Sequence, residues 1–360
     1  MPVLVDKYVE SPCCVEWIGV AFHWNPTDYP TRVQPVAMSA RWGKPFQDPR
    51  HWPTYNEALV LRGEFYLDLR PLLRWDQELI LMNRGKRGGQ YQVPPSFLRW
   101  LVLWKQWVDY RGLEGICRRM VQLGLIPHAP DYTTLWHRLH DLTPTVRMSP
   151  YQDLELAADG TGLKTSNAGE YRIFRYGDPE ARRRKHLVVV ITADVRRKKV
   201  MGIEVHIEGK GHSESRSAAA HVRAAAERGY RVRKFYGDEA YDTNGMFRAL
   251  HEAGTEPVIK IRKSAASRIR SNWSNWKARR RAVREDPALG YRAWAEEKGY
   301  GMRWPGTEGI ISAVKRKFGE NMVARSPRGL EAEGYQRIWA YDELREYGEG
   351  AMAAPGAPPR

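Results

Sequence analysis

The order of strand-like runs and helical segments between residues 154 and 261 most constrains the fold of this chain. Leu187–Ala193 has the unbroken apolar character of a fully buried strand, whereas Lys199–Glu208 alternates as a strand with one wet face does. The remaining expected elements are strands at Leu154–Ala158, Val232–Gly237 and Pro257–Ile261, and helices at Ser213–Arg228 and Asn244–Ala253. This order predicts an α/β fold, a mixed sheet with helices on its faces.

The sequence before this region predicts helices only. Helical spacing is found at residues 55–62, 72–82, 97–110, 113–123 and 132–140, and Asp131 is the expected N-cap of the last segment. A turn with Gly and Pro precedes that segment, as in a helix-turn-helix unit. Its last helix would then present Thr134 and Arg138 to a DNA groove. A plain three-helix bundle is the alternative.

Composition favours a polyanionic partner. The 360 residues include 58 Lys and Arg against 42 Asp and Glu, a formal net charge of +16, which is typical of nucleic-acid-binding proteins. A basic protein without such a partner, or one that meets anionic lipid, is the alternative. We expect no membrane span, no signal peptide and a cytoplasmic location. Cys13, Cys14 and Cys117 have neither zinc-site spacing nor a disulfide framework.

Three carboxylates stand out by their settings. Asp159 is expected to end a strand just before Gly160, Asp238 directly follows another strand, and Glu308 opens a basic helix. Ligands of such sheets gather at strand ends, and carboxylate oxygens suit Mg²⁺. Paired ions can hold the attacking and leaving oxygens of a phosphoryl transfer. Lys315 lies two helical turns after Glu308, on the same face, where it would hold a DNA phosphate.

Each acid also has a structural interpretation. Asp159 could cap the turn formed by the glycines that follow it. Asp238 competes with Asp242, which is itself a candidate cap for the helix starting near Thr243. Glu308 could be an acid favoured by the dipole at a helix start.

A basic segment lies between the last strand and the helix of Glu308. Residues 262–285 hold nine Lys and Arg residues against Glu285, with Trp273 and Trp276 among them. Basic charge with interleaved aromatic residues is typical of a DNA-gripping insertion, and a solvated basic loop is the alternative. Residues 182–185 and 196–199 would add phosphate contacts that do not depend on base sequence. The candidates in the segment itself are Lys277, Arg279, Arg280 and Arg281.

Four short motifs resemble one known family. Residues 158–162, 206–212, 236–242 and 308–315 are similar to the catalytic domain of DDE transposases from prokaryotic insertion sequences, in the branch with a Glu-x6-Lys signature. The three acids lie 79 and 70 residues apart. Residues 130–135 also resemble the helical N-terminal domain of that group. One departure is visible: four residues, where the family has three, separate Arg303 of the Tyr300–Arg303 pair from Glu308.

The resemblance implies a ribonuclease-H-like catalytic domain at 151–345 with a basic insertion at 262–300. It further implies a helical DNA-binding domain at 53–145. Residues 1–52 are rich in Pro, Trp and turn formers and stay undefined, and the low-complexity C-terminus predicts a disordered tail at 346–360. The family's Asp, Asp and Glu correspond to Asp159, Asp238 and Glu308, as catalytic residues and metal ligands. Its Lys corresponds to Lys315, and Arg303 is a further expected DNA contact.

The implied activity is DNA transposition. Terminal inverted repeats of a mobile element would be bound and cut, and their 3′-hydroxyls joined to target DNA, with two Mg²⁺ or Mn²⁺ ions as cofactors. The expected partners are double-stranded transposon ends and target DNA, in a homodimer or larger assembly associated with a prokaryotic nucleoid. A domesticated or inactive transposase that only binds DNA, and a stand-alone metal-dependent nuclease, are the alternatives.

Overall fold

The expected mixed sheet is present. The computed structural model describes residues 51–147, 149–165, 186–208, 212–262, 279–284 and 290–353. Five strands lie in the order β3-β2-β1-β4-β5. They are β1 (Asp153–Leu163), β2 (Leu187–Asp194), β3 (Lys199–Ile207), β4 (Arg231–Gly237) and β5 (Glu256–Ile259).

The directions of the strands define the fold further. β2 is antiparallel to both β1 and β3, whereas β4 is parallel to β1 and β5 is parallel to β4. The β2–β3 hairpin turns at Lys198, which adopts a left-handed φ of 54°. This arrangement confirms the α/β class with a mixed sheet that the sequence predicts.

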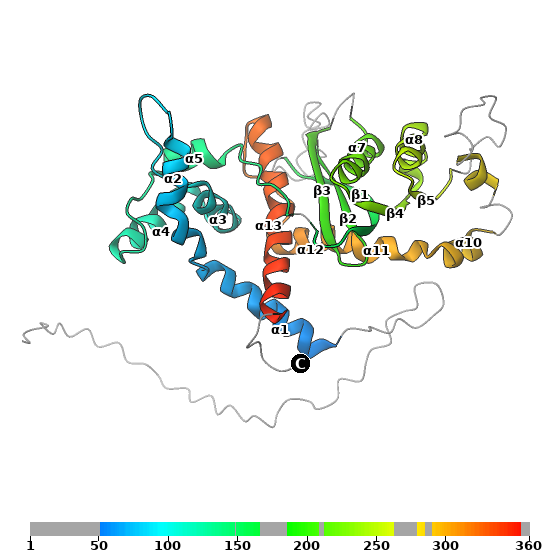
Figure 1. The fold of residues 1–360 in the computed structure, drawn as a ribbon, viewed down its shortest axis with the longest axis horizontal. Coiled ribbons are helices and arrows are strands. Elements are labelled where there is room, and N and C mark those ends of the chain that lie inside the picture. Colours follow the sequence, from blue (N-terminus) through cyan, green and yellow to red (C-terminus); the bar gives the residue numbers. More distant parts are fainter. Residues whose placement is uncertain are drawn as a thin grey trace, which may run out of the picture. The chain divides into compact units, whose positions relative to one another are not determined.

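Two helices cover one face of the sheet. α7 (Glu214–Glu227) and α8 (Asn244–Glu252) lie on this face (Figure 1). Their apolar side chains share one buried cluster with alternate residues of β1, namely Leu154, Leu156 and Ala158. Ser213 caps α7 through its side chain. Thr243 caps α8, so the alternative in which Asp242 forms that cap is wrong.

The opposite face is covered by the C-terminal part of the chain. Along it run α10 (Tyr291–Lys298), η6 (Tyr300–Met302), α11 (Arg303–Gly306), α12 (Glu308–Phe318) and the long α13 (Pro327–Ala353). α13 corrects the sequence interpretation at its end, because residues 346–353, assigned to a disordered tail, are helical. Residues 354–360 of that tail lie outside the described part.

The helical region contains α1 (Trp52–Glu64), η2 (Phe65–Leu67), η3 (Arg70–Arg74), α2 (Trp75–Asn83), α3 (Pro95–Lys105), α4 (Tyr110–Gln122) and α5 (Tyr132–Leu139). The expected helix at 97–110 is wrong at its end. α3 stops at Lys105, and Asp109 caps a new helix by accepting from the Gly112 N–H at 2.7 Å. Asp131 caps α5 as predicted, accepting from Thr134 at 2.8 Å.

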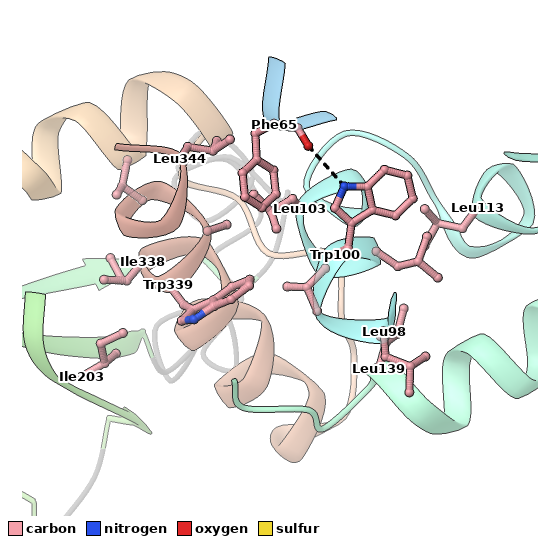
Figure 2. Close-up of a cluster of buried hydrophobic side chains, with 14 of the residues drawn as sticks. Phe65, Leu98, Trp100, Leu103, Leu113, Leu139, Ile203, Ile338, Trp339 and Leu344 are labelled. Carbon is pink, nitrogen blue, oxygen red and sulfur yellow. Dashed lines mark hydrogen bonds between the residues drawn. The ribbon is translucent and has the colours of Figure 1, made fainter. Parts of the chain in front are cut away.

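One apolar core joins this helical region to the sheet. Side chains of α3, α4 and α5 belong to the same buried cluster as residues of α13 and of β2 and β3. Figure 2 shows Trp339 of α13 between Trp100 of α3 and Ile203 of β3. The Trp100 indole also donates to the Phe65 carbonyl at 3.2 Å. Among the described residues, no helix combines the length and the hydropathy that crossing a bilayer requires.

Two glycines of α13 allow a test of this packing. A Cβ on Gly348 would lie 2.5 Å from the Ala58 carbonyl oxygen of α1, whereas one on Gly350 meets nothing within 4 Å. Gly348→Ala should therefore lower the free energy of unfolding by about 1–3 kcal/mol through forced separation of the helices. Gly350→Ala should raise it by up to about 1 kcal/mol through helix propensity. Urea unfolding measures both, and equal effects would contradict close packing of α1 on α13.

Candidate active site

Asp159 lies within β1 and not at its end. The strand continues to Leu163 against β2, which corrects the expected boundary. Pairing with the parallel strand β4, however, stops at Ala157, so Asp159 is just beyond the parallel pair. Alternation along the strand places it on the face of Ala157, the face covered by α10 and η6. Burial raises the pKa of its carboxyl, and the Arg303 guanidinium opposes that rise.

Asp238 comes directly after β4, at the same edge of the sheet. Its Oδ1 accepts from the Ala240 N–H at 2.8 Å, which starts the short turn η5 (Glu239–Tyr241). Its competitor Asp242 has a fully buried carboxylate that receives two bonds from Arg279, at 2.7 and 3.0 Å. Asp242 therefore has a structural partner, and Asp238 is the acid at the strand end.

Glu308 is the first residue of α12 and is linked to Asp238 through Arg303. Thr307 lies directly before it, where α11 meets α12. Thr307, with φ −118° and ψ −61°, donates through its hydroxyl to the Arg303 carbonyl at 3.1 Å. The helical path is thereby distorted but continuous, because Ile311 N–H still donates to the Thr307 carbonyl at 3.0 Å.

Arg303 links these acids. Its Nη1 lies 3.7 Å from Asp238 Oδ2, and its Nη2 donates to Glu308 Oε1 at 3.3 Å. The side chain is 9% exposed, and its Nε is buried with no partner among the described residues. The positive charge of Arg303 also opposes the rise that burial causes in the pKa of the Asp159 carboxyl, so one guanidinium acts electrostatically on all three predicted acids.

Glu214 is a fourth acid at this site, and sequence reasoning missed it. It opens α7, and burial raises the pKa of its carboxyl, with further contributions from the charges of Asp238 and Asp159. A Cβ on Gly160 would overlap this carboxyl, so the close approach of α7 to β1 requires glycine there. The available signal was its position directly after the His206–His212 motif.

The donor chemistry at this edge suits a hard divalent cation, since all four groups are carboxylates and such ions prefer oxygen. Their spacing is wider than a closed metal site. Among the residues that the structure describes, no three acidic, His or Cys side chains lie close enough together to hold one ion. The Arg303 guanidinium lies between two of the carboxylates instead.

The predicted DNA contacts have different surroundings. Lys315 faces Glu320 at 3.6 Å, on the turn of α12 farthest from Glu308. Arg279 is tied to Asp242, Arg280 is half-buried and Arg281 is exposed. Lys277 lies outside the described residues, as do residues 182–185.

Two further groups of predicted contacts were located. In α5, Thr134 donates to Asp131 at 3.0 Å, and Arg138 lies over the Tyr91 ring at 4.7 Å. The most exposed side chains of that helix include Trp136 and His137. In the β2–β3 turn, Arg196 pairs with Glu155, Arg197 with Asp194, and Lys199 with Asp342 and Glu346. These basic groups therefore have acidic partners within the fold.

Comparison with known proteins gives several matches. An uncharacterised protein of Aquifex aeolicus (strain VF5) is 25% identical over 211 residues, which are 54% of this chain and 61% of that protein. The chain thus spans less than two thirds of the length of that relative. A piggyBac transposase in a synaptic complex with hairpin DNA has 10% identity and a TM-score of 0.38, covering 82% of this chain and 76% of its own. A pre-cleavage Mos1 transpososome has 12% identity and a TM-score of 0.22, and the match covers 87% of this chain and 100% of that chain.

The family model described as a transposase DDE domain matches residues 150–342. This range is more than half of the 360 residues and includes the whole sheet together with Asp159, Asp238 and Glu308. The chain therefore belongs to the family of transposase DDE domains.

Proposed function

We propose that the protein is a DNA transposase that binds the terminal inverted repeats of a mobile element, cleaves its ends and joins the 3′-hydroxyls to target DNA. The observation that carries the proposal is that one guanidinium, that of Arg303, contacts both Asp238 and Glu308, and its charge also opposes the rise that burial causes in the pKa of Asp159. Asp159 comes from β1, Asp238 from the end of the adjacent parallel strand β4, and Glu308 from the start of α12. Membership of the transposase DDE domain family supports this assignment.

Asp159, Asp238 and Glu308 would hold Mg²⁺ or Mn²⁺, in two sites, with Glu214 as a neighbouring carboxylate. When bound, such ions activate an attacking water or 3′-hydroxyl and stabilise the leaving oxygen. The chain's own contribution is to keep the carboxylates in position. Gly160 leaves room for Glu214 beside β1, and the turn after Asp238 fixes one of its oxygens on a backbone N–H.

The DNA would run over basic and aromatic groups on both parts of the chain. Arg281 and the exposed face of α5, with Trp136, are accessible for this role. A net charge of +16 supports binding that weakens steeply as salt rises, because each phosphate contact releases counterions. Lys315, Arg280, Thr134 and Arg138 belong to the same proposed surface.

Assembly and location follow from this activity. Coupled cutting of two transposon ends needs two active sites, and therefore at least a homodimer. The DNA substrate places the protein with the nucleoid of a prokaryotic cell. Target DNA is the second nucleic-acid partner.

Substitutions of the acids test the catalytic assignment. Asp159→Asn, Asp238→Asn and Glu308→Gln should each reduce cleavage of labelled transposon-end DNA by at least about a hundredfold, because each removes a ligand from the reaction centre. DNA binding, measured by gel shift, should be retained. Asp153→Asn, which removes an exposed carboxylate paired with Arg233 at the start of the same strand, is the matched control and should cut normally.

Three other outcomes would correct or replace the proposal. Full activity in one acid variant would remove that acid from the site. Binding of end DNA without cleavage in either Mg²⁺ or Mn²⁺ would indicate a domesticated or inactive transposase. Cleavage of any DNA without strand transfer would indicate a stand-alone nuclease.

Neighbouring arginines of the basic insertion should behave differently. Arg279→Gln removes the ion-pair partner of the buried Asp242 carboxylate and should lower the free energy of unfolding by about 3–5 kcal/mol. Arg281→Gln removes an exposed charge; it should leave stability within about 0.5 kcal/mol and weaken DNA binding. Thermal unfolding and gel shifts at two salt concentrations measure both. A stable Arg279→Gln protein with weakened DNA binding would instead make Arg279 a DNA contact.

A further inference from the structure

We infer that the Arg303 guanidinium is an internal counter-cation of the acidic site: it holds Asp238 and Glu308 together in the absence of metal, and a divalent ion enters only when Arg303 withdraws. This inference rests on the proposed function, which assigns these acids to metal binding. It adds a positioning residue whose effect is on metal affinity.

The geometry places one cation between two carboxylates that come from different elements. Nη1 of Arg303 faces Asp238 at 3.7 Å and Nη2 faces Glu308 at 3.3 Å. At 9% exposure the guanidinium is shielded from water, and shielded charges are screened little by salt. Without it, Asp238 and Glu308 would lose a guanidinium that contacts both of them, in a site where Asp159 and Glu214 add further negative charge.

The same position conflicts with a bound ion. Mg²⁺ sits about 2.0–2.1 Å from its ligand oxygens. An ion shared by Asp238 and Glu308 would therefore lie within a few ångström of the guanidinium that now contacts both. Two positive charges that close, in a partly buried site, repel each other, so metal and guanidinium compete for the same oxygens.

Arg303 is also held loosely enough to leave. Its two contacts to the acids are longer than a strong charge-assisted hydrogen bond, and its Nε has no partner among the described residues. Two aromatic faces are within reach, because the guanidinium carbon lies 5.6 Å from the Tyr300 ring and 5.5 Å from the Trp304 ring. The guanidinium already makes cation–π contacts with these rings, which can continue to stabilise its charge after its contacts to the carboxylates break.

Lys260 provides a matched control. Its ammonium lies near the site but pairs with Glu239 at 2.6 Å and does not bridge the acids. Lys260→Gln therefore removes one positive charge from the same neighbourhood while leaving the contested oxygens unchanged. A general loss of charge and a specific loss of competition can thus be separated.

The experiment measures Mn²⁺ binding to the full chain without DNA, by titration calorimetry, and thermal unfolding with and without Mn²⁺. Arg303→Gln should bind Mn²⁺ at least about tenfold more tightly than the parent protein, since a contact cation has been removed. Its metal-free form should melt at a lower temperature, and its Mn²⁺-induced rise in Tm should be larger. Arg303→Lys keeps the charge but not the fork that spans two carboxylates, so its affinity should fall between the two. Lys260→Gln should stay within about twofold of the parent.

Each result decides the inference. Unchanged or weaker Mn²⁺ binding in Arg303→Gln would overturn it, as would an equal gain in Lys260→Gln. If Arg303→Gln does not fold without metal, refolding by Mn²⁺ supports the inference, and failure to refold leaves the affinity of Arg303→Lys to decide it. If the parent protein and all variants bind no Mn²⁺, the metal assignment of the proposed function fails, which is a different result from an unchanged affinity.

Discussion

The parallel pairing of β1 with β4 is the constraint on which the site depends. The parallel pairing of β1 with β4 stops at Ala157 on β1, and β4 itself ends at Gly237. Asp159 and Asp238 therefore both lie just beyond the paired part of the two strands. The two carboxylates are brought together by backbone hydrogen bonds and by the burial of Leu156 and Phe235, and not by any attraction of their own. Like charges held in this way need a nearby cation, and in this structure that cation belongs to Arg303.

Much of the sheet was predictable because its signals are local. The apolar run of β2 and the Asp131 cap are properties of neighbouring residues, and the structure confirms them. β3 is a strand as expected, but its predicted wet face is wrong, because Glu204 is its only exposed residue. The end of β1 was misjudged because the glycines after Asp159 suggested a turn. They remain in the strand because their backbone pairs with β2. The absence of a side chain at Gly160 also leaves room for the Glu214 carboxyl.

Contacts between residues far apart in the sequence could not be predicted from local sequence patterns. Glu214 looked like an ordinary helix-start residue, and only the packing of α7 on β1 brings it to Gly160. Arg279 looked like one of several basic surface residues, but Asp242, far from it in sequence, holds it. Helix α13 was missed as a single element because its buried charges, such as the Glu333–Arg337 pair, obscure the apolar stripe that it buries.

α13 also changes what the two parts of the chain can do relative to each other. Gln336 in its middle donates to the carbonyls of Leu139 and Leu142 at the end of α5, at 2.8 and 2.7 Å, while the other side of the helix packs on β2 and β3. A helix-turn-helix unit on a flexible tether could bind DNA at many distances from a catalytic centre. Under the proposed function, the core that α3, α4 and α5 share with the sheet would fix the number of base pairs between a sequence contacted by α5 and a bond cut beside Asp159.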